Sequence, residues 1–374
     1  MFLGALSGFT VGVTADRRAE EQTELLARRG AEVVSGPVIR TLPLSDEQPL
    51  TEATTALVAE PPDHVVLSTA LGVRAWYSSA EGLGLLDPLR AVLRDATVIA
   101  RGPKAAGAAL TYGLDVDWVT PNATYAEVVD HLAVRRPAEG ERPRRVALQL
   151  DGERSSGLAD ALRDLGYEVV PVPVYEWHLP DDLGPAERLV AAAAERAVDA
   201  ITFTSAHAVT NFGHIAESSG RLGAVVEAAA AGALSIVCVG PVTAARARSF
   251  GFDTCVEPAH PRLGAMVQAL VVAFTDRTVA VDLQGIQVLL QGRLVSADGG
   301  PPIRLTDRER ALLEALARRP GAVVSKRSLL NEVWAGESDD HVVEVTVARL
   351  RRRLGAAGGG IETVVRRGYR LAAS

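Results

Sequence analysis

Three short helices followed by a hairpin are predicted by the spacing of hydrophobic residues near the carboxyl end of the chain. Thr306 and Glu309 fit the capping-box pattern that starts a helix, and Pro320 ends that helix after a run of leucines. Ser325 then caps a second helix, which ends at residues 334–336.

The third helix of this segment is predicted over residues 340–354. Its apolar residues recur at spacings of four, three and four, which places one stripe against a core: Val343, Val347, Leu350 and Leu354. Several polar side chains lie largely off that stripe, namely Thr346, Arg349, Arg352 and Arg353. Residues 361–371 are then typical of a two-stranded hairpin with Arg366 and Arg367 at its tip.

This arrangement is typical of a helix-turn-helix followed by a wing. A helix fits the major groove of DNA, where arginines pair with guanine edges, and wing arginines suit phosphates or the minor groove. We therefore predict double-stranded DNA as a partner and transcriptional regulation as the function. The candidate DNA-binding residues are His341, Thr346, Arg349, Arg352, Arg353, Arg366 and Arg367.

The carboxyl-terminal segment resembles the OmpR/PhoB-type winged-helix domain over about residues 283–374. The resemblance is carried in order by VAVDLQGIQVLLQGRL, LTDRERALLEAL, VVSKRSLLNEVW, VVEVTVARLRRRL and TVVRRGYRL. The wing departs from the family's usual Arg-Gly-Thr-Gly-Tyr pattern, because its first three positions are Val365, Arg366 and Arg367. Contacts made by the family's first wing arginine are therefore expected from Arg366 or Arg367.

In that family the winged helix normally follows a phosphorylatable receiver domain, and this chain lacks the residues that such a domain needs. A receiver requires an acidic pair after its first strand and a lysine after its fifth. Here Lys104 and Lys326 are the only lysines, and the first predicted strand ends in Thr14-Ala15-Asp16. The rest of the chain is therefore expected to control DNA binding by other means.

Residues 10–272 contain short apolar strands that alternate with Ala- and Leu-rich helices, and this pattern occurs twice. Segment 9–39 matches 146–175, DHVVLST matches DAITFTS, and residues 98–115 match 236–253. Such alternation predicts an α/β fold with two parallel sheets flanked by helices. The strand ends, rich in Gly, Ser and Thr, are expected at the edge where α/β folds bind ligands.

This doubled region resembles uroporphyrinogen-III synthase across about residues 10–272. The resemblance rests on LARRGAEVVSGPVI, the paired DHVVLSTALGVRAW and DAITFTSAHAVTNF, and VCVGPVTAARARSFGF. It implies a two-domain fold in which residues 1–39 and 178–272 form a discontinuous first domain and residues 43–175 form the second. Residues 273–282 would then link this body to the winged-helix domain at 283–374.

The same resemblance implies an activity and a ligand. The family cyclises hydroxymethylbilane, a linear tetrapyrrole with eight carboxylates, in a cleft between its two domains and without a metal or other cofactor. Tyr175 and Thr243 match the family's catalytic candidates. The residues that match its ligand-binding cleft are Thr14, Arg17, Ser68, Thr69, Gly102, Lys104, Asp151, Gly152, Thr204, Ser205 and Gly240.

The sequence also departs from the synthase pattern. Val242 replaces the first Thr of the family's Gly-Pro-Thr-Thr run, and Thr14-Ala15-Asp16 replaces Thr-Arg-Pro. Asp151 stands where the family often has a cation, and an anion there costs affinity for a polyanion unless Arg154 neutralises it.

Two functions remain open for the body on these grounds. In the leading hypothesis it senses a tetrapyrrole or other small anionic ligand, or docks a partner, and biases the placement of the winged helix. In the alternative it is an active uroporphyrinogen-III synthase of tetrapyrrole and sirohaem biosynthesis with a DNA-binding appendage. A third hypothesis is a co-regulator that acts beside a second winged-helix protein or RNA polymerase. The fusion itself resembles bacterial regulators of nitrate and nitrite assimilation.

Charge supports a nucleic-acid contact at the carboxyl end. The 374-residue chain has a net charge of −7, yet residues 275–374 carry 16 Lys and Arg against 12 Asp and Glu, whereas the remainder carries 23 against 34. No apolar stretch reaches the roughly 18 residues of a membrane span, and no signal peptide is recognised. We therefore expect a cytoplasmic bacterial protein that joins the nucleoid when it binds DNA. Cys238 and Cys255 are expected as free thiols, and the histidine spacing predicts no metal site.

Overall fold

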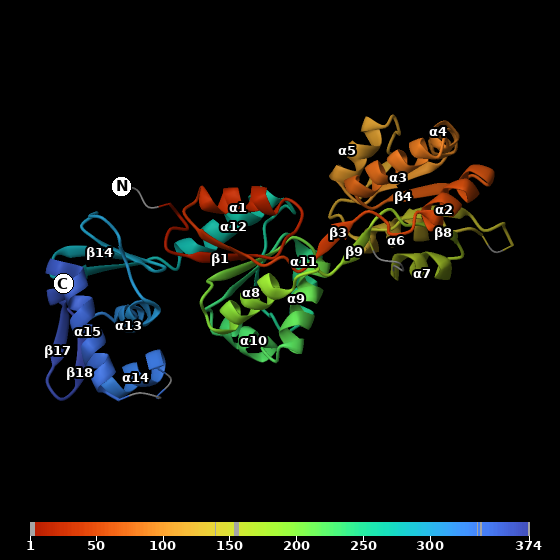
Figure 1. Cartoon of the computed structure of the whole chain (residues 1–374). Coiled ribbons are helices and arrows are strands. Elements are labelled where there is room, and N and C mark those ends of the chain that lie inside the picture. Colours follow the sequence, from red (N-terminus) through yellow and green to blue (C-terminus); the bar gives the residue numbers. More distant parts are fainter. Residues whose placement is uncertain (1–3, 139, 153–156, 335, 337–338, 373–374) are drawn as a thin grey trace. The chain divides into compact units, whose positions relative to one another are not determined.

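The computed structural model describes residues 4–138, 140–152, 157–334, 336 and 339–372. The chain divides into two compact units, one made of residues 1–38 and 180–374 and the other of residues 39–179. Figure 1 shows the whole chain and labels many of the helices and strands of both units. Within the described residues, every helix is too short or too polar to cross a lipid bilayer.

The first unit contains a five-stranded parallel sheet in the order β12-β11-β10-β1-β2. Its strands are β1 (Thr10–Val13), β2 (Glu32–Ser35), β10 (Ala200–Phe203), β11 (Ser235–Cys238) and β12 (Cys255–Val256). Its helices are α1 (Ala19–Ala27), α8 (Gly184–Ala194), α9 (Ala206–Ser218), α10 (Leu222–Ala230), α11 (Pro241–Ser249) and α12 (Leu263–Thr275). The central strands β1 and β10 are buried along their whole length, as expected for a parallel sheet covered on both faces.

The second unit repeats this architecture with the sheet order β6-β5-β4-β7-β8. Its strands are β4 (His64–Leu67), β5 (Thr97–Ala100), β6 (Trp118–Val119), β7 (Arg145–Gln149) and β8 (Glu168–Val172). Its helices are α2 (Gln48–Ala59), α3 (Ala70–Gly82), α4 (Leu86–Arg94), α5 (Pro103–Thr111), α6 (Tyr125–Ala133) and α7 (Gly157–Asp164). Two short strands, β3 (Arg40–Leu42) and β9 (Glu176–His178), pair antiparallel beside this sheet.

The pairing register confirms that the two parallel sheets are repeats of one pattern. Val11 pairs with Ala200 in the first sheet, and Val146 pairs with His64 in the second. The predicted match of segment 9–39 with 146–175, and of 63–69 with 199–205, therefore corresponds to equivalent strands. Their carboxyl ends lie at one edge of each sheet, followed by the starts of α3, α5, α9 and α11.

The carboxyl-terminal part of the first unit is a winged helix. An antiparallel sheet comes first, made of β13 (Val279–Leu283), β14 (Ile286–Gln291), β15 (Leu294–Ala297) and β16 (Ile303–Arg304). There follow α13 (Asp307–Ala317), α14 (Lys326–Trp334), α15 (His341–Leu354), a 3₁₀ helix (Gly355–Gly360) and the hairpin of β17 (Ile361–Val364) and β18 (Gly368–Leu371).

The local sequence signals of this domain are confirmed. Thr306 and Glu309 form the predicted capping box at the start of α13. All four apolar residues of the predicted stripe on α15 are buried in the domain core. The predicted end of the second helix includes Ala335, which lies outside the described residues.

The predicted linker, residues 273–282, is shorter in the structure. The apolar face of α12 continues through the buried Phe274 to Thr275, and β13 already begins at Val279. Only residues 276–278 lie between helix and strand, and Arg277 within them donates to the Gly232 carbonyl at 2.6 Å and to the Ser235 hydroxyl at 3.0 Å. The junction is therefore fixed to the first unit rather than free.

Candidate DNA interface and synthase-like site

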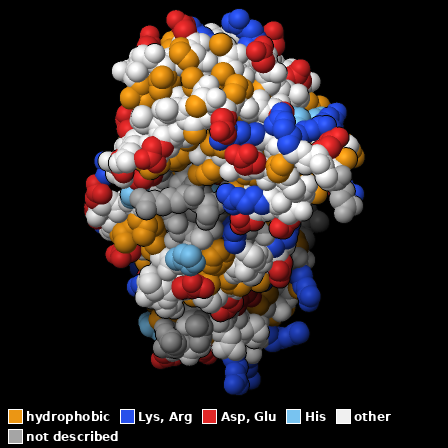
Figure 2. Space-filling view, turned by 90° about the vertical axis from the view of Figure 1, so that its right-hand side faces the viewer, with side chains coloured by type: hydrophobic (Ala, Val, Ile, Leu, Met, Phe, Trp, Pro, Cys, Tyr) orange, Lys and Arg blue, Asp and Glu red, His pale blue; other side chains and the backbone are white. Residues whose placement is uncertain are grey.

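Free arginines on the outer face of α15 form the centre of the candidate DNA interface. Arg349 and Arg352 are exposed, and within the described chain neither guanidinium has a hydrogen bond or an ion pair. By contrast, the face drawn in Figure 2 has basic side chains interspersed with acidic ones. Unpaired guanidinium groups on an exposed helix face are free to contact base edges or phosphates.

The structure adds Val345 to this face. Val345 is an exposed hydrophobic residue four positions before Arg349 and seven before Arg352, so the three side chains share one side of the helix. The sequence analysis missed it because it searched the outer face for polar residues only. A helical projection, which sets Val345 opposite the buried stripe, is the signal that could have found it.

Two residues predicted to bind DNA have hydrogen-bond partners within the winged helix. The Thr346 hydroxyl donates to the Val342 carbonyl at 2.7 Å, one turn back in the same helix. Arg353 donates to the buried Glu309 carboxylate at 2.9 Å and to the Arg304 carbonyl, so its guanidinium braces the domain core. Thr346 and Arg353 lie three positions before and four positions after Arg349 on the same side of α15, and their polar groups already have partners within the domain.

His341 lies exposed at the start of α15. Its Nδ1 atom is 3.6 Å from a Glu344 carboxylate oxygen, and Glu344 also forms an ion pair with Lys326 of α14. That ion pair lowers the pKa of Glu344 and raises that of Lys326. Both side chains of this contact are solvent-accessible, so His341 lies on the surface that the start of α15 presents.

The wing presents Arg366 and Arg367 at its exposed tip, between β17 and β18. Arg366 has a φ of 61°, a left-handed conformation that closes the tight turn. Arg351 braces the wing from α15, because its guanidinium donates to the Ile361 carbonyl at 2.8 Å and to the Thr363 hydroxyl at 2.9 Å.

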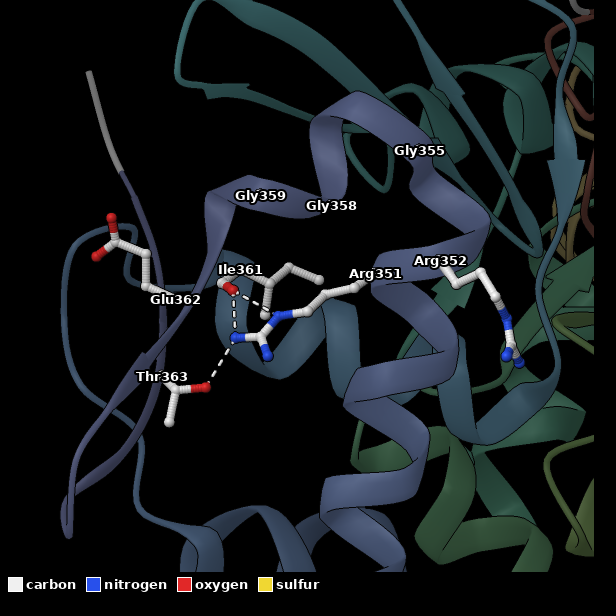
Figure 3. A pocket seen from close by; sticks show the side chains of 8 residues that line it. All are labelled: Arg351, Arg352, Gly355, Gly358, Gly359, Ile361, Glu362 and Thr363. Atoms are coloured by element: carbon white, nitrogen blue, oxygen red, sulfur yellow. Dashed lines mark hydrogen bonds between the residues drawn. The ribbon is translucent and has the colours of Figure 1, made fainter.

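An open hollow of about 600 Å³ lies between the end of α15 and the wing. Figure 3 shows Arg351 directed at the wing across this hollow and Arg352 pointing to the other side of the helix. The same helix thus supplies one arginine that holds the wing in place and another that is free for DNA.

In the second unit, polar residues converge at the carboxyl ends of β4 and β7. The Gln149 side-chain oxygen accepts from the backbone amides of Ser68 and Thr69 at 3.1 and 3.0 Å, and thereby occupies the amino-terminal end of α3. The Thr69 hydroxyl accepts from the Gly72 amide at 3.0 Å and lies 3.4 Å from the Tyr175 hydroxyl. Of the predicted residues, Ser68, Thr69 and Tyr175 are therefore brought together.

Asp151 has a cationic partner other than the one expected. Its carboxylate lies 2.8 Å from the Arg101 guanidinium, whereas Arg154 lies outside the described residues. Arg101 also stacks 4.5 Å above the Tyr125 ring, and burial of that ring raises the pKa of the Tyr125 hydroxyl, which donates to Ser68 at 3.4 Å. The acidic replacement at position 151 is thus neutralised within the unit.

Glycines shape the edges of this cluster. Gly152 has a φ of +96°, and a Cβ atom there would lie 2.7 Å from the Trp177 ring, so only glycine fits. Gly102 is buried at the start of α5, and Lys104 is exposed in the first turn of that helix.

The corresponding residues of the first unit are mostly turned inward. Thr14 is fully buried, and its hydroxyl donates to the Thr202 carbonyl at 2.7 Å, while Arg17 is exposed. Ser205 accepts from the Ala208 amide at 3.1 Å as the cap of α9, beside the half-buried Thr204.

The start of α11 carries Val242 and Thr243 where the family resemblance predicts two threonines. Gly240 is buried before the helix, and the side chains of Val242 and Thr243 differ in their exposure to solvent. Thr243 is only 4% exposed, whereas Val242 is 51% exposed. At position 242, where the family resemblance predicts a threonine, the chain therefore exposes an isopropyl group.

A doubled parallel α/β body joined to a winged helix defines a two-part regulator class, and the family comparisons agree. The chain belongs to the uroporphyrinogen-III synthase HemD family, which it matches over residues 20–268. Residues 300–371 match the family "Transcriptional regulatory protein, C terminal". The chain is thus a DNA-binding regulator with a HemD-like body.

Individual relatives cover both parts. An uncharacterized Bacillus subtilis protein, YjjA, is 27% identical over 273 residues, 73% of this chain and 98% of its own length. The Brucella ovis cell cycle response regulator CtrA is 32% identical over 136 residues, 34% of this chain and 58% of its own length. The crystal structure of a mutant uroporphyrinogen III synthase from Thermus thermophilus is 27% identical with a TM-score of 0.59, covering 72% of this chain and 99% of that one.

Proposed function

We propose that this regulator uses its synthase-like body to sense a small anionic ligand, or to dock a partner, rather than to cyclise hydroxymethylbilane. The observation that carries the proposal is the start of α11, where the accessible side chain is Val242 and the remaining hydroxyl, Thr243, is buried. A hydroxyl has to reach the leaving group to assist its departure, and the isopropyl group of Val242 has no proton to give.

The charge balance in the second unit supports the same reading. Arg101 is engaged by Asp151 at 2.8 Å, so its charge is largely compensated before any polyanion arrives. Lys104 of the same unit is an exposed cation in the first turn of α5. A body of this kind suits a ligand with fewer carboxylates than hydroxymethylbilane, or one held with modest affinity.

Ligand binding would act on DNA binding through a difference in affinity for two arrangements of the chain. A ligand that prefers one arrangement raises its population, and it shifts the equilibrium only by that difference in affinity. The proposed outputs are Arg349, Arg352 and the wing arginines, which are exposed on α15 and at the tip of the wing.

An active synthase is the second candidate, favoured by one observation. Tyr175, which matches the family's tyrosine, lies 3.4 Å from the Thr69 hydroxyl at the carboxyl ends of the strands. A hydroxyl pair of this kind is able to pass a proton to a leaving group.

A synthase assay separates the two candidates. Purified protein is mixed with freshly generated hydroxymethylbilane, and type III product is scored against the type I product that forms spontaneously. The sensor proposal predicts type I product only, from folded protein that still binds DNA. Type III product above background, lost in Tyr175→Phe, would establish the enzyme instead.

The regulated genes are proposed from the resemblance of this fusion to regulators of nitrate and nitrite assimilation. Chromatin immunoprecipitation in the native host, grown on nitrate and on ammonium, is the direct test. Enrichment of promoters for nitrite or nitrate reduction supports the proposal, and enrichment confined to unrelated promoters rejects it. Co-precipitation of a second winged-helix protein or RNA polymerase would identify the proposed protein partners.

A further inference from the structure

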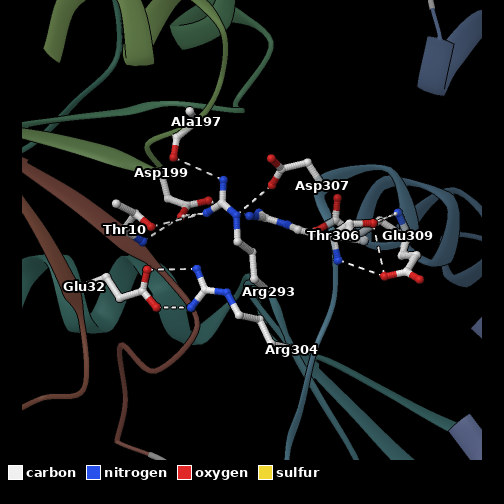
Figure 4. A network of polar contacts seen from close by, with 11 residues as sticks. Thr10, Glu32, Ala197, Asp199, Arg293, Arg304, Thr306, Asp307 and Glu309 are labelled. Atoms are coloured by element: carbon white, nitrogen blue, oxygen red, sulfur yellow. Dashed lines mark hydrogen bonds and ion pairs between the residues drawn. The ribbon is translucent and has the colours of Figure 1, made fainter. Parts of the chain in front are cut away.

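Asp199 lies at the amino-terminal edge of the first parallel sheet, immediately before β10, and is almost completely buried. Its side chain is 3% exposed, and its carboxylate accepts from the Thr10 backbone amide at 2.8 Å. Two guanidinium groups bind this carboxylate: Arg310 lies at 2.7 Å, and Arg293 lies at 3.1 Å, as Figure 4 shows.

Both arginines belong to the winged helix and not to the synthase-like body. Arg293 lies in the turn between β14 and β15, and Arg310 lies in α13. Arg293 is itself 8% exposed and also binds Asp307 at 2.6 Å and the Ala197 carbonyl at 3.1 Å. Burial of charges on both sides is tolerated only because each one is paired and hydrogen-bonded.

The backbones of the two parts approach closely beside this cluster. The Arg293 amide donates to the Gly8 carbonyl at 2.8 Å, and the Gln291 side chain donates to the Gly4 carbonyl at 2.8 Å. A Cβ atom at Gly8 would lie 2.3 Å from the Gln291 carbonyl oxygen, and one at Gly292 would lie 2.3 Å from the Gly8 carbonyl oxygen. Both positions therefore require glycine for the contact to form.

The second repeat provides an internal comparison. Asp63 is the equivalent of Asp199, and it caps β7 by accepting from the Arg145 amide at 2.7 Å. Its ion-pair partner is Arg142, a neighbouring residue whose side chain is 75% exposed. Capping the strand thus needs no buried arginine, and the two at Asp199 serve the attachment of another domain.

We infer that the amino-terminal edge of this sheet is a docking surface for the winged helix, held through Asp199, and that the two move as one rigid body. The candidate ligand residues Thr14, Ser205 and Gly240 lie at the opposite, carboxyl-terminal edge of the same sheet. A ligand signal then reaches DNA because the first parallel sheet and the winged helix move together, and not because the winged helix is released from the sheet. This inference is independent of the proposed ligand and of any synthase activity.

Hydrogen–deuterium exchange on the full chain tests the docking. In the wild-type protein, peptides that contain residues 4–10 and 287–295 should be protected. In the Arg293→Gln/Arg310→Gln double variant, both should exchange about tenfold faster or more, together, while peptides from α15 keep their wild-type rates. The single variant Arg310→Gln keeps the Arg293 ion pair and the hydrogen bond from the Thr10 amide to Asp199. It should therefore give an exchange rate between those of the wild type and the double variant.

Two control variants make the result specific. Asp63→Ala removes the equivalent strand cap from the other repeat and should leave both peptides protected. Arg304→Ala removes the exposed ion pair with Glu32 and should change their exchange little. Rapid exchange of both peptides in the wild-type protein would overturn the inference, as would unchanged protection in a folded double variant. DNA binding is measured separately, so loss of docking is distinguishable from loss of the regulator's function.

Discussion

Arg353 of α15 donates to the carboxylate of Glu309 in α13 at 2.9 Å, and only 1% of the Glu309 side chain is exposed. Arg349, one turn earlier on the same helix, has no such partner in the described part of the chain. The arginines of this helix thus divide into those that stabilise the winged helix and those that are free for DNA. Composition alone cannot make this distinction.

Replacing Arg353 with alanine should therefore lower stability, whereas replacing Arg349 should lower DNA binding. Arg353→Ala leaves the buried Glu309 unpaired and should lower the free energy of unfolding by about 2 kcal/mol, a value reduced for the partial exposure of Arg353. Arg349→Ala should change it by less than about 0.5 kcal/mol but abolish sequence-specific DNA binding, as should Arg352→Ala. Denaturant unfolding and mobility-shift titrations measure the two effects. Equal loss of stability in both variants would reject the division.

Arg366→Ala should weaken binding to all DNA sequences by a similar factor. An exposed wing arginine that contacts phosphate contributes counterion release, so the slope of log affinity against log salt should fall by about one. Fluorescence anisotropy with specific and unrelated duplexes, at several salt concentrations, gives this slope. Arg370→Ala is the matched control, because Arg370 is already paired with Glu362 at 2.7 Å. A loss confined to one DNA sequence would show instead that Arg366 reads bases.

The second unit should lose stability in mild acid because of His64. Within the described chain neither ring nitrogen of this buried histidine has a hydrogen-bond partner, and burial lowers its pKa below 6.5. Asp63 opposes this shift, whereas Arg144, Arg135 and His131 act with burial. Because the unfolded state binds the proton more tightly, stability is complete above pH 6.5 and falls as the pH drops through the folded-state pKa.

Denaturant unfolding between pH 8 and pH 5 tests this dependence. His64→Leu should remove part of the acid-induced loss, while a substitution at the exposed His260 should leave the profile as it is. An identical pH profile for His64→Leu and the wild type would assign the acid sensitivity to other groups. His131 is the next candidate, since burial also lowers its pKa.

Asp151→Asn should strengthen the binding of carboxylate-rich tetrapyrroles. The substitution removes the negative charge that compensates Arg101, and about 1.4 kcal/mol of recovered attraction corresponds to a tenfold gain in affinity. Isothermal titration with uroporphyrin III as a stable probe measures it, and Arg101→Gln should act in the opposite direction. Unchanged affinity in both variants would place the ligand away from this pair.

Much of the fold followed from local signals, and the site residues followed less well. The capping box at Thr306 and the stripe on α15 depend on residues three to eleven positions apart, where helix geometry fixes their neighbours. The Arg353–Glu309 pair spans 44 residues and the Arg293–Asp199 pair spans 94, and no periodicity encodes such distances. The sequence analysis therefore listed Arg353 among the DNA-binding residues with no sign that Glu309 holds its guanidinium.

The neutralisation of Asp151 illustrates the same limit. A sequence search for its cation favours a near neighbour such as Arg154, but residues that follow parallel strands gather at one edge of the sheet, and only β4 lies between β5 and β7. Arg101 directly follows β5, so it reaches Asp151 through the sheet although 50 residues separate the two. Knowing the sheet order, which the sequence analysis did not predict, would have identified this partner.

The central claim is that the outer face of α15 reads specific DNA, and selection from a randomised duplex library tests it most directly. Full-length wild-type protein should enrich one motif over several rounds, with half-sites suited to a recognition helix in the major groove. The folded Arg349→Ala/Arg352→Ala variant should enrich none. Failure of the wild-type protein to enrich any sequence, or recovery of the same motif by the double variant, would contradict the account.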